Sequence, residues 1–141
     1  MEKQMTTKRR AEPPQVRLKI LLAEDEPMVR QLFAKPLTRA GHTVFEAKDG
    51  EQAEAVWREH KPFDVIALDV RMPYKSGVEV ARLLKEEGES LDRILLFSGY
   101  PGANDCEDLE TVEFLAKPFS GDEWVDKIRK VAEKGREGSN R

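Results

Sequence analysis

The chain has 141 residues, of which 39% are hydrophobic and 36% are charged, and its formal net charge is −3. This composition fits one soluble domain with an ordinary core. The net charge offers no broad positive field for nucleic acid, and no apolar run reaches the roughly 18 residues that a membrane span needs. Because no apolar signal segment stands out either, we expect a cytoplasmic protein with no direct nucleic-acid or membrane partner.

Residues 1–17 lack apolar periodicity and carry five basic residues against two acidic ones. We expect a basic, disordered tail here. An arm that contacts nucleic acid is the alternative, and it is less favoured because no aromatic residues or DNA-binding fold accompany the basic residues.

A buried strand is predicted within residues 18–26, because an unbroken apolar run lies there. The run ends in Glu24, Asp25 and Glu26. In an open parallel sheet, the carboxyl ends of the strands border the ligand crevice, so these acids are candidate site residues.

A helix should follow from Pro27 to Gly41, since proline suits a first helical turn and glycine commonly follows a last one. Pro36 lies inside this helix and removes one backbone hydrogen bond at a cost of about 3 kcal/mol. We therefore expect a kink near residues 32–36. The expected apolar stripe consists of Val29, Leu32, Phe33 and Leu37.

The segment 42–47 predicts a second strand, in which aromatic and β-branched residues are the main apolar ones. The segment 49–60 predicts a second helix. Its buried face should carry Ala53, Val56 and Trp57.

A third strand is predicted within residues 63–73, where an apolar run ends in Asp69. Asp69 either faces the ligand crevice or caps the following turn, and both fit the local sequence. If the first and third strands are neighbours, Asp25 and Asp69 repel by about 4 kcal/mol at about 4 Å with an effective dielectric constant of about 20. A cation would relieve this repulsion, and an oxygen-only cluster favours Mg²⁺, or Mn²⁺ in its place.

A third helix is predicted over residues 78–88. The fourth and fifth strands should lie within 93–101 and 111–119, and they close on Ser98 and Lys117. Each of these two residues alone has an ordinary explanation as a turn or loop residue. Two acids, a hydroxyl and an amine at one end of four strands together indicate a site. The inward side chains of the third helix should be Val78, Val80, Ala81 and Leu84.

The fourth helix, expected within residues 99–111, should be short or irregular because this segment is rich in poor helix formers. Ser120 and Glu123 predict a capping box at the start of the last helix. We expect this helix to fray after Lys134 and residues 135–141 to form a polar tail. Its apolar stripe should be Trp124, Val125, Ile128, Val131 and Ala132.

Residues 18–134 resemble a response-regulator receiver domain, the phosphoacceptor module of two-component signalling. The resemblance rests on Glu24 and Asp25, LDVRMP with Asp69, Gly77, FSG with Ser98, and AKPF with Lys117. It implies a single doubly wound (βα)5 domain of the flavodoxin-like α/β class. Such a domain has a five-stranded parallel sheet with helices on both faces.

By this resemblance, Asp69 accepts a phosphoryl group from a sensor histidine kinase or a histidine phosphotransfer protein. Asp25, Asp69 and the backbone carbonyl of Arg71 would hold Mg²⁺, and Glu24 would act through water. Lys117 would contact the phosphoryl oxygens. The peptide bond after Lys117 is expected to be cis.

The resemblance also implies a switch in which the Ser98 hydroxyl moves to the phosphoryl group and Phe114 rotates inward. A core phenylalanine that never moves is the alternative for Phe114. Arg71 and Tyr100 lie two residues past Asp69 and Ser98, and we expect them to tune the rate of dephosphorylation.

Three functions fit the sequence. The favoured one is a phosphorylation switch, not a turnover enzyme, that acts on an unidentified downstream protein and is compatible with a homodimer. A receiver-like scaffold that is never phosphorylated is the second. The third is an aspartate-nucleophile phosphatase, which usually carries a second aspartate where this chain has Arg71.

Overall fold

The computed structural model describes residues 16–99, 107–109 and 111–139. Its strands are β1 (Lys19–Ala23), β2 (Thr43–Ala47), β3 (Val65–Asp69), β4 (Ile94–Ser98) and β5 (Glu113–Ala116). Its helices are α2 (Pro27–Arg39), α3 (Gly50–His60), α4 (Gly77–Glu86) and α5 (Gly121–Ser139), with 3-10 turns η1 (Leu91–Arg93) and η2 (Glu107–Leu109).

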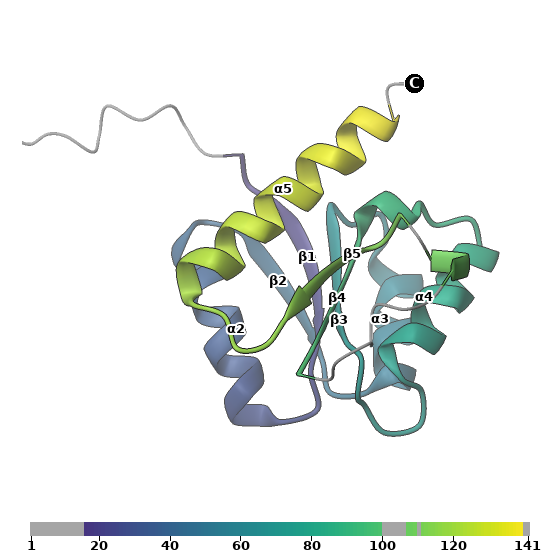
Figure 1. Ribbon diagram of the computed structural model, residues 1–141, viewed down its shortest axis with the longest axis horizontal. Coiled ribbons are helices and arrows are strands. Elements are labelled where there is room, and N and C mark those ends of the chain that lie inside the picture. Colours follow the sequence, from purple (N-terminus) through teal and green to yellow (C-terminus); the bar gives the residue numbers. More distant parts are fainter. Residues whose placement is uncertain (1–15, 100–106, 110, 140–141) are drawn as a thin grey trace, which may run out of the picture.

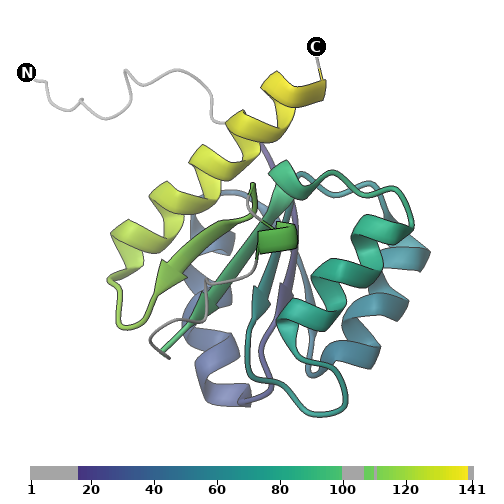
Figure 2. The same ribbon diagram turned by 45° about the vertical axis from the view of Figure 1, so that its right-hand side comes forward.

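The five strands form one parallel sheet in the order β2-β1-β3-β4-β5 (Figure 1). Helices α2 and α5 cover one face of this sheet, and α3 and α4 cover the other (Figures 1 and 2). The predicted doubly wound flavodoxin-like α/β fold is therefore confirmed.

Each face of the sheet has its own hydrophobic core. The three inner strands are apolar on both faces, which explains why their sequences are unbroken apolar runs and not alternating patterns. The α2/α5 core contains Ile20, Leu22, Leu37, Val65, Phe97, Trp124 and Ile128. The α3/α4 core contains Leu21, Ala53, Trp57, Ile66, Leu68, Ala81 and Leu84.

Side-chain caps begin several helices. The predicted capping box of α5 is present, because Glu123 N–H donates to Ser120 Oγ at 3.0 Å and Ser120 N–H donates to Glu123 Oε1 at 2.7 Å. A second capping box, which the sequence did not lead us to expect, joins Ser76 and Glu79 at the start of α4. This second box fixes where the chain turns from the end of β3 into α4.

One predicted core residue of α2 is exposed. Leu32 is 67% exposed, whereas Ala34 and Leu37 are buried. Successive residues are about 100° apart around a helix, so Leu32 is turned away from the face that Phe33 and Leu37 share. The helix continues through Pro36, and a kink there stays a prediction.

The last helix is longer than predicted. It runs to Ser139 instead of fraying after Lys134, because η1 packs against its final turns. Gly135 lies so close to η1 that an added Cβ would be 2.8 Å from Arg93 Cγ. Lys134 Nζ also contacts Glu113 at 3.0 Å. These contacts stabilise the last turns of α5, although the sequence there lacks an apolar pattern.

Between β4 and β5, the described residues contain only the 3-10 turn η2. Leu109 of this turn is 4% exposed and joins the α3/α4 core. Residues 100–106 and 110 lie outside the described residues. Over the part that is described, the expectation of a short or irregular fourth helix is confirmed.

The expected N-terminal tail, 1–17, falls almost wholly outside the described residues, and Val16 and Arg17 are exposed. Within residues 16–99, 107–109 and 111–139, none of the helices combines the length and the apolar character that a membrane span requires.

Candidate functional site

Side-chain alternation brings three charged residues to the same face of the sheet. Asp69 is the last residue of β3, Glu24 directly follows β1, and Lys117 directly follows β5. By the alternation of side chains along a strand, all three should point to the face of the sheet that α2 and α5 cover. The residues two positions earlier already lie in the α2/α5 core, namely Leu22, Ala67 and Leu115. Because the strands are parallel and in register, the three charged groups meet at the carboxyl edge of the sheet.

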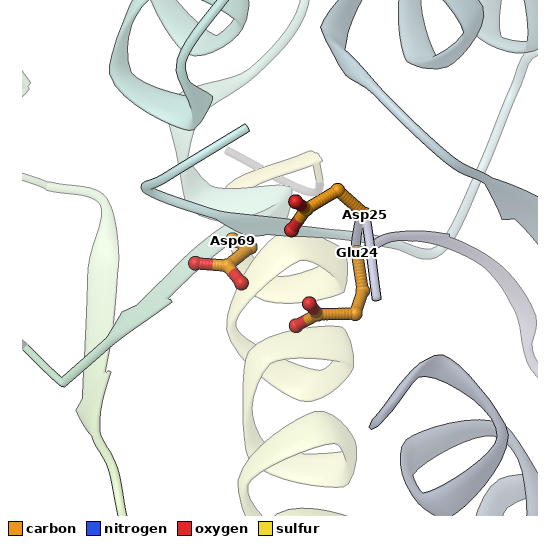
Figure 3. A group of neighbouring side chains, drawn as sticks. All are labelled: Glu24, Asp25 and Asp69. Atoms are coloured by element: carbon orange, nitrogen blue, oxygen red, sulfur yellow. The ribbon is translucent and has the colours of Figure 1, made fainter. Parts of the chain in front are cut away.

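Three carboxyl groups converge at this edge. One carboxylate oxygen from each of Glu24, Asp25 and Asp69 lies within 4.8 Å of the other two, and Figure 3 shows the side chains turned toward a common space. Glu24 is 2% exposed and Asp69 is 4% exposed, whereas Asp25 is half-buried. The acids line a hollow of about 810 Å³, and its lining also includes Arg71, Ser98 and Lys117.

Lys117 supplies positive charge to this group. Its Nζ lies 3.2 Å from Asp69 Oδ2 and 3.5 Å from Glu24 Oε1. The Lys117 N–H donates to the Ser98 carbonyl at 2.8 Å, which continues the pairing of β4 with β5. The peptide bond from Lys117 to Pro118 is cis, as expected. The lysine is therefore held at the carboxyl edge by its backbone as well as by its ion pairs.

Glu24 is electrostatically strained by its neighbours. Burial, a hydrogen bond with Asp69 and the negative charge of Asp69 raise the pKa of Glu24 to about 8. The Glu26 N–H, which donates to Glu24 Oε2 at 3.2 Å, and the charge of Lys117 lower this pKa only in part. Placing two carboxyl groups this close in a buried position lowers the stability of the folded protein.

Arg30 holds the backbone that carries the acidic pair. Its Nη1 donates to the Glu24 carbonyl at 2.7 Å, and its Nε donates to Glu46 Oε1 at 3.1 Å. The Glu24 N–H also donates to the Ala47 carbonyl at 3.0 Å. Sequence reasoning missed Arg30, because its role depends on a contact between α2 and β2 that no local motif announces.

The loop after Asp69 is folded tightly against it. The Arg71 N–H donates to Asp69 Oδ1 at 3.1 Å, which fixes the direction of the carboxylate. The Gly77 N–H donates to the Val70 carbonyl at 3.0 Å. A Cβ on Gly77 would lie 2.3 Å from the Asp69 carbonyl oxygen, so only glycine fits between β3 and α4.

The remaining predicted site residues are Ser98, Phe114, Arg71 and Tyr100. Ser98 is 1% exposed at the end of β4, and Phe114 is partly buried on the α3/α4 face. The side chain of Arg71 lines the hollow, and Tyr100 lies outside the described residues. Movement of Ser98 and Phe114, and control of dephosphorylation by Arg71 and Tyr100, stay predictions.

An aromatic cluster borders the site and was not predicted as a unit. The rings of Phe119 and Trp124 stack with centroids 5.3 Å apart, and Phe33 packs on both at 5.1 Å. Phe97 meets Trp124 edge to face at 5.3 Å. These residues come from α2, β4, α5 and the segment before α5, so their meeting follows from the tertiary fold alone.

The acidic group fits a hard divalent cation. Its donors are carboxylate oxygens, which Mg²⁺ prefers, and the adjoining hollow has room for the water ligands that Mg²⁺ retains. Arg71, whose carbonyl was predicted as a ligand, borders the same hollow. The pKa of Glu24 points the same way, since a neighbouring cation would relieve its repulsion from Asp69.

Comparison with known proteins gives one family. The family model of the response regulator receiver domain matches residues 20–129. The chain is 34% identical over 116 residues to the phosphate regulon transcriptional regulatory protein PhoB of Pseudomonas aeruginosa, which covers 79% of this chain and 50% of that protein. It is 28% identical over 115 residues to sporulation initiation phosphotransferase F of Bacillus subtilis, covering 79% of this chain and 91% of that protein.

Solved structures give the same result. The response regulator TrrA of Thermotoga maritima, solved in complex with Mg(2+)-BeF, is 30% identical with a TM-score of 0.71 and covers 79% of this chain and 96% of that chain. The chemotaxis protein CheY4 of Vibrio cholerae is 26% identical with a TM-score of 0.74 and covers 82% of this chain and 99% of that one. The chain spans about half the length of the transcriptional regulators that it matches.

Proposed function

This chain belongs to the response regulator receiver domain family, and we propose that it is a phosphoacceptor switch in which Asp69 receives a phosphoryl group from a phosphohistidine. The observation that carries the proposal is the meeting of Asp69 with Asp25, Glu24 and Lys117 in one hollow at the carboxyl edge of the sheet.

In the proposed transfer, an oxygen of the Asp69 carboxylate forms a bond to phosphorus while the phosphorus–nitrogen bond of the phosphohistidine breaks. The electron pair of that bond leaves with the imidazole. A carboxylate needs no base to activate it, so the protein must mainly place the acceptor and neutralise charge on the phosphoryl oxygens. Lys117 Nζ, 3.2 Å from Asp69 Oδ2, is within reach of these oxygens.

The same site would hold Mg²⁺, or Mn²⁺ in its place. Asp25, Asp69 and the Arg71 carbonyl are the proposed direct ligands, and Glu24 is proposed to act through water. When bound, the cation supplies positive charge next to the transferred group. The hydrogen bond from Arg71 N–H to Asp69 orients one carboxylate oxygen, which leaves the other oxygen for Lys117.

The proposed output is a conformational switch. Moving a two-state equilibrium from 99:1 to 1:99 takes about 5.5 kcal/mol of differential stabilisation. Charged hydrogen bonds contribute about 1.5–3 kcal/mol each, so bonds from Ser98 and Lys117 that form only in the phosphorylated state are of the right size. Phe114 would follow Ser98, and Arg71 and Tyr100 would tune how long the phosphate lasts.

The proposed partners are a sensor histidine kinase or histidine phosphotransfer protein upstream and an unidentified protein downstream. The phosphotransferase named among the relatives supports the upstream partner, because this chain covers 91% of that protein. We propose a switch and not a turnover enzyme, since the phosphoryl group is received by the protein itself.

The test is incubation of the full chain with Mg²⁺ and acetyl phosphate, followed by intact mass and tryptophan fluorescence. We expect a gain of one phosphoryl group that is absent in Asp69→Asn and preserved in Asp64→Asn. Asp64 is a suitable control because its side chain bonds Lys19 N–H at the opposite edge of the sheet. An unmodified wild-type chain would contradict the proposal and favour a scaffold that is never phosphorylated.

A further inference from the structure

Two phenylalanine rings flank the ammonium group of Lys117. The Lys117 Nζ lies 5.4 Å from the ring centroid of Phe97 and 5.7 Å from that of Phe33, over each ring. Both distances are within the roughly 6 Å at which a cation is attracted to an aromatic face. The same nitrogen lies 3.2 Å from Asp69 Oδ2 and 3.5 Å from Glu24 Oε1. The ammonium therefore contacts the proposed phosphoacceptor and Glu24 while it lies over the two rings.

The two rings are fixed by the core and not by the lysine. Phe97 is fully buried and stands opposite Asp69 in the pairing of β3 with β4. The rings of Phe33 and Phe97 meet edge to face, with centroids 5.4 Å apart and planes at 86°. Trp124 Nε1–H donates to the Phe33 carbonyl at 2.8 Å. Because neighbours determine both ring positions, the rings can determine where the lysine goes.

We propose that Phe33 and Phe97, called here the aromatic pair, are positioning residues that hold the Lys117 ammonium beside Asp69 before any phosphoryl group arrives. The positioning itself is a property of the unphosphorylated protein. Its effect on phosphoryl transfer rests on the function proposed above.

An aromatic pair suits this task better than another carboxylate would. A lysine side chain has a flexible four-carbon stem and loses considerable rotamer freedom when it is held in one place. A further carboxylate would hold the ammonium but would also cancel its charge and repel the incoming phosphoryl oxygens. A ring face attracts the ammonium and leaves its full charge available.

The test replaces Phe97 by trifluorinated phenylalanine in the full chain. This analogue has nearly the size of phenylalanine, but fluorine withdraws the negative charge of the ring face that attracts the ammonium. The matched control carries the same analogue at Phe119, a ring of the same cluster that packs on Phe33 at 5.1 Å. The first readout is the NMR signal of the Lys117 ε-methylene group in metal-free protein, assigned with Lys117→Met.

We expect the Lys117 signal in the wild type to be shifted upfield by the two rings, and to move toward the position of exposed lysines when Phe97 is fluorinated. The rate of phosphorylation by acetyl phosphate should fall about two- to tenfold in the same protein. Fluorination of Phe119 should leave the signal and the rate close to wild type. Phe97→Leu, which removes the ring, should reproduce the loss of the upfield shift.

The two proposals fail in different ways. A wild-type Lys117 signal that coincides with exposed lysines and ignores fluorination of Phe97 would overturn the positioning role, whatever the phosphorylation result. In a chain that does take up phosphate, equal phosphorylation rates with the analogue at Phe97 and at Phe119 would overturn the effect of the aromatic pair on phosphoryl transfer. A signal that responds as expected in a chain that never takes up phosphate would support the aromatic pair and overturn the proposed function.

Discussion

The two ends of the sheet differ in how their charged residues are arranged. At the carboxyl end, Glu24, Asp25 and Asp69 gather within 4.8 Å, and the pKa of Glu24 is raised to about 8, first by burial and then by Asp69. At the amino end, Glu113 of β5 pairs with Lys127 at 2.8 Å and with Lys134 at 3.0 Å. The bond from Lys127, above all, lowers the pKa of Glu113.

The difference separates stability from function. Pairing of opposite charges at the amino end is what folding alone favours, although each exposed pair contributes little. Like charges at the carboxyl end oppose folding, so their presence there indicates a functional role. The same sheet thus has an end with paired opposite charges and an end with a cluster of carboxyl groups, whose repulsion the proposed cation would relieve.

The largest expected difference between the two ends is in the effect of replacing a lysine on the phosphorylation rate. Replacing Lys117 by Met should slow phosphorylation by acetyl phosphate about 100-fold, because it removes a charged donor aimed at the transferred group. Lys134→Met, at the amino end, should leave the rate unchanged. The measurement is the rate constant of phosphate uptake by intact mass with saturating Mg²⁺. Similar rates for the two variants would remove the functional distinction between the ends.

A second contrast concerns the stability of the metal-free protein. Glu24→Gln should raise the free energy of unfolding at pH 8 by about 1–3 kcal/mol, because it removes a buried acid that repels Asp69. Glu113→Gln should lower it, by less than about 1 kcal/mol, because it breaks pairs that are partly exposed. Urea unfolding of both variants checks the signs.

The pH dependence of these two effects follows from the pKa shifts. The folded pKa of Glu24 is above its ordinary value of 4.5, so wild-type stability falls as pH rises from 4.5 to about 8, and the gain from Glu24→Gln grows over this range. The folded pKa of Glu113 is lowered, so its contribution is present above pH 4.5 and is lost on acidification. Equal signs for the two variants at pH 8 would contradict the comparison.

The smallest expected effect lies at the amino end. The Leu18 N–H donates to His42 Nδ1 at 3.1 Å, and burial lowers the pKa of His42 although the charge of Asp64 raises it. The unfolded chain therefore takes up a proton at higher pH than the folded one, and stability should fall as pH drops through 6.5. His42→Asn should reduce the change of the urea midpoint between pH 7 and pH 5. If the midpoint changes with pH as it does in the wild type, His42 is excluded as the source of this pH dependence.

The sequence was most informative where an apolar run ends in a charged or hydroxyl residue. Such runs are buried strands, and parallel strands share one carboxyl edge, so Asp25, Asp69, Ser98 and Lys117 could be placed together without a structure. The helices on both faces of the sheet were implied by the resemblance to receiver domains.

Features that depend on contacts between distant elements could not be predicted in this way. The contact of Arg30 with Glu46 joins α2 to β2, and the contact of α5 with η1 extends the helix past Lys134. The exposure of Leu32 depends on how α2 is rotated against the sheet. Periodicity gives the existence of a helix, whereas its rotation and its ends are set by neighbours.

Gly77 shows how a residue without a functional group can be as constrained as the proposed phosphoacceptor. The added carbon of an alanine would lie 2.3 Å from the Asp69 carbonyl oxygen, a separation at which the chain has to be displaced. In a mutational survey, position 77 would tolerate no replacement and would resemble a site of chemistry. Its intolerance measures how closely two backbone segments approach, and a catalytic map drawn from sensitivity alone would place it wrongly.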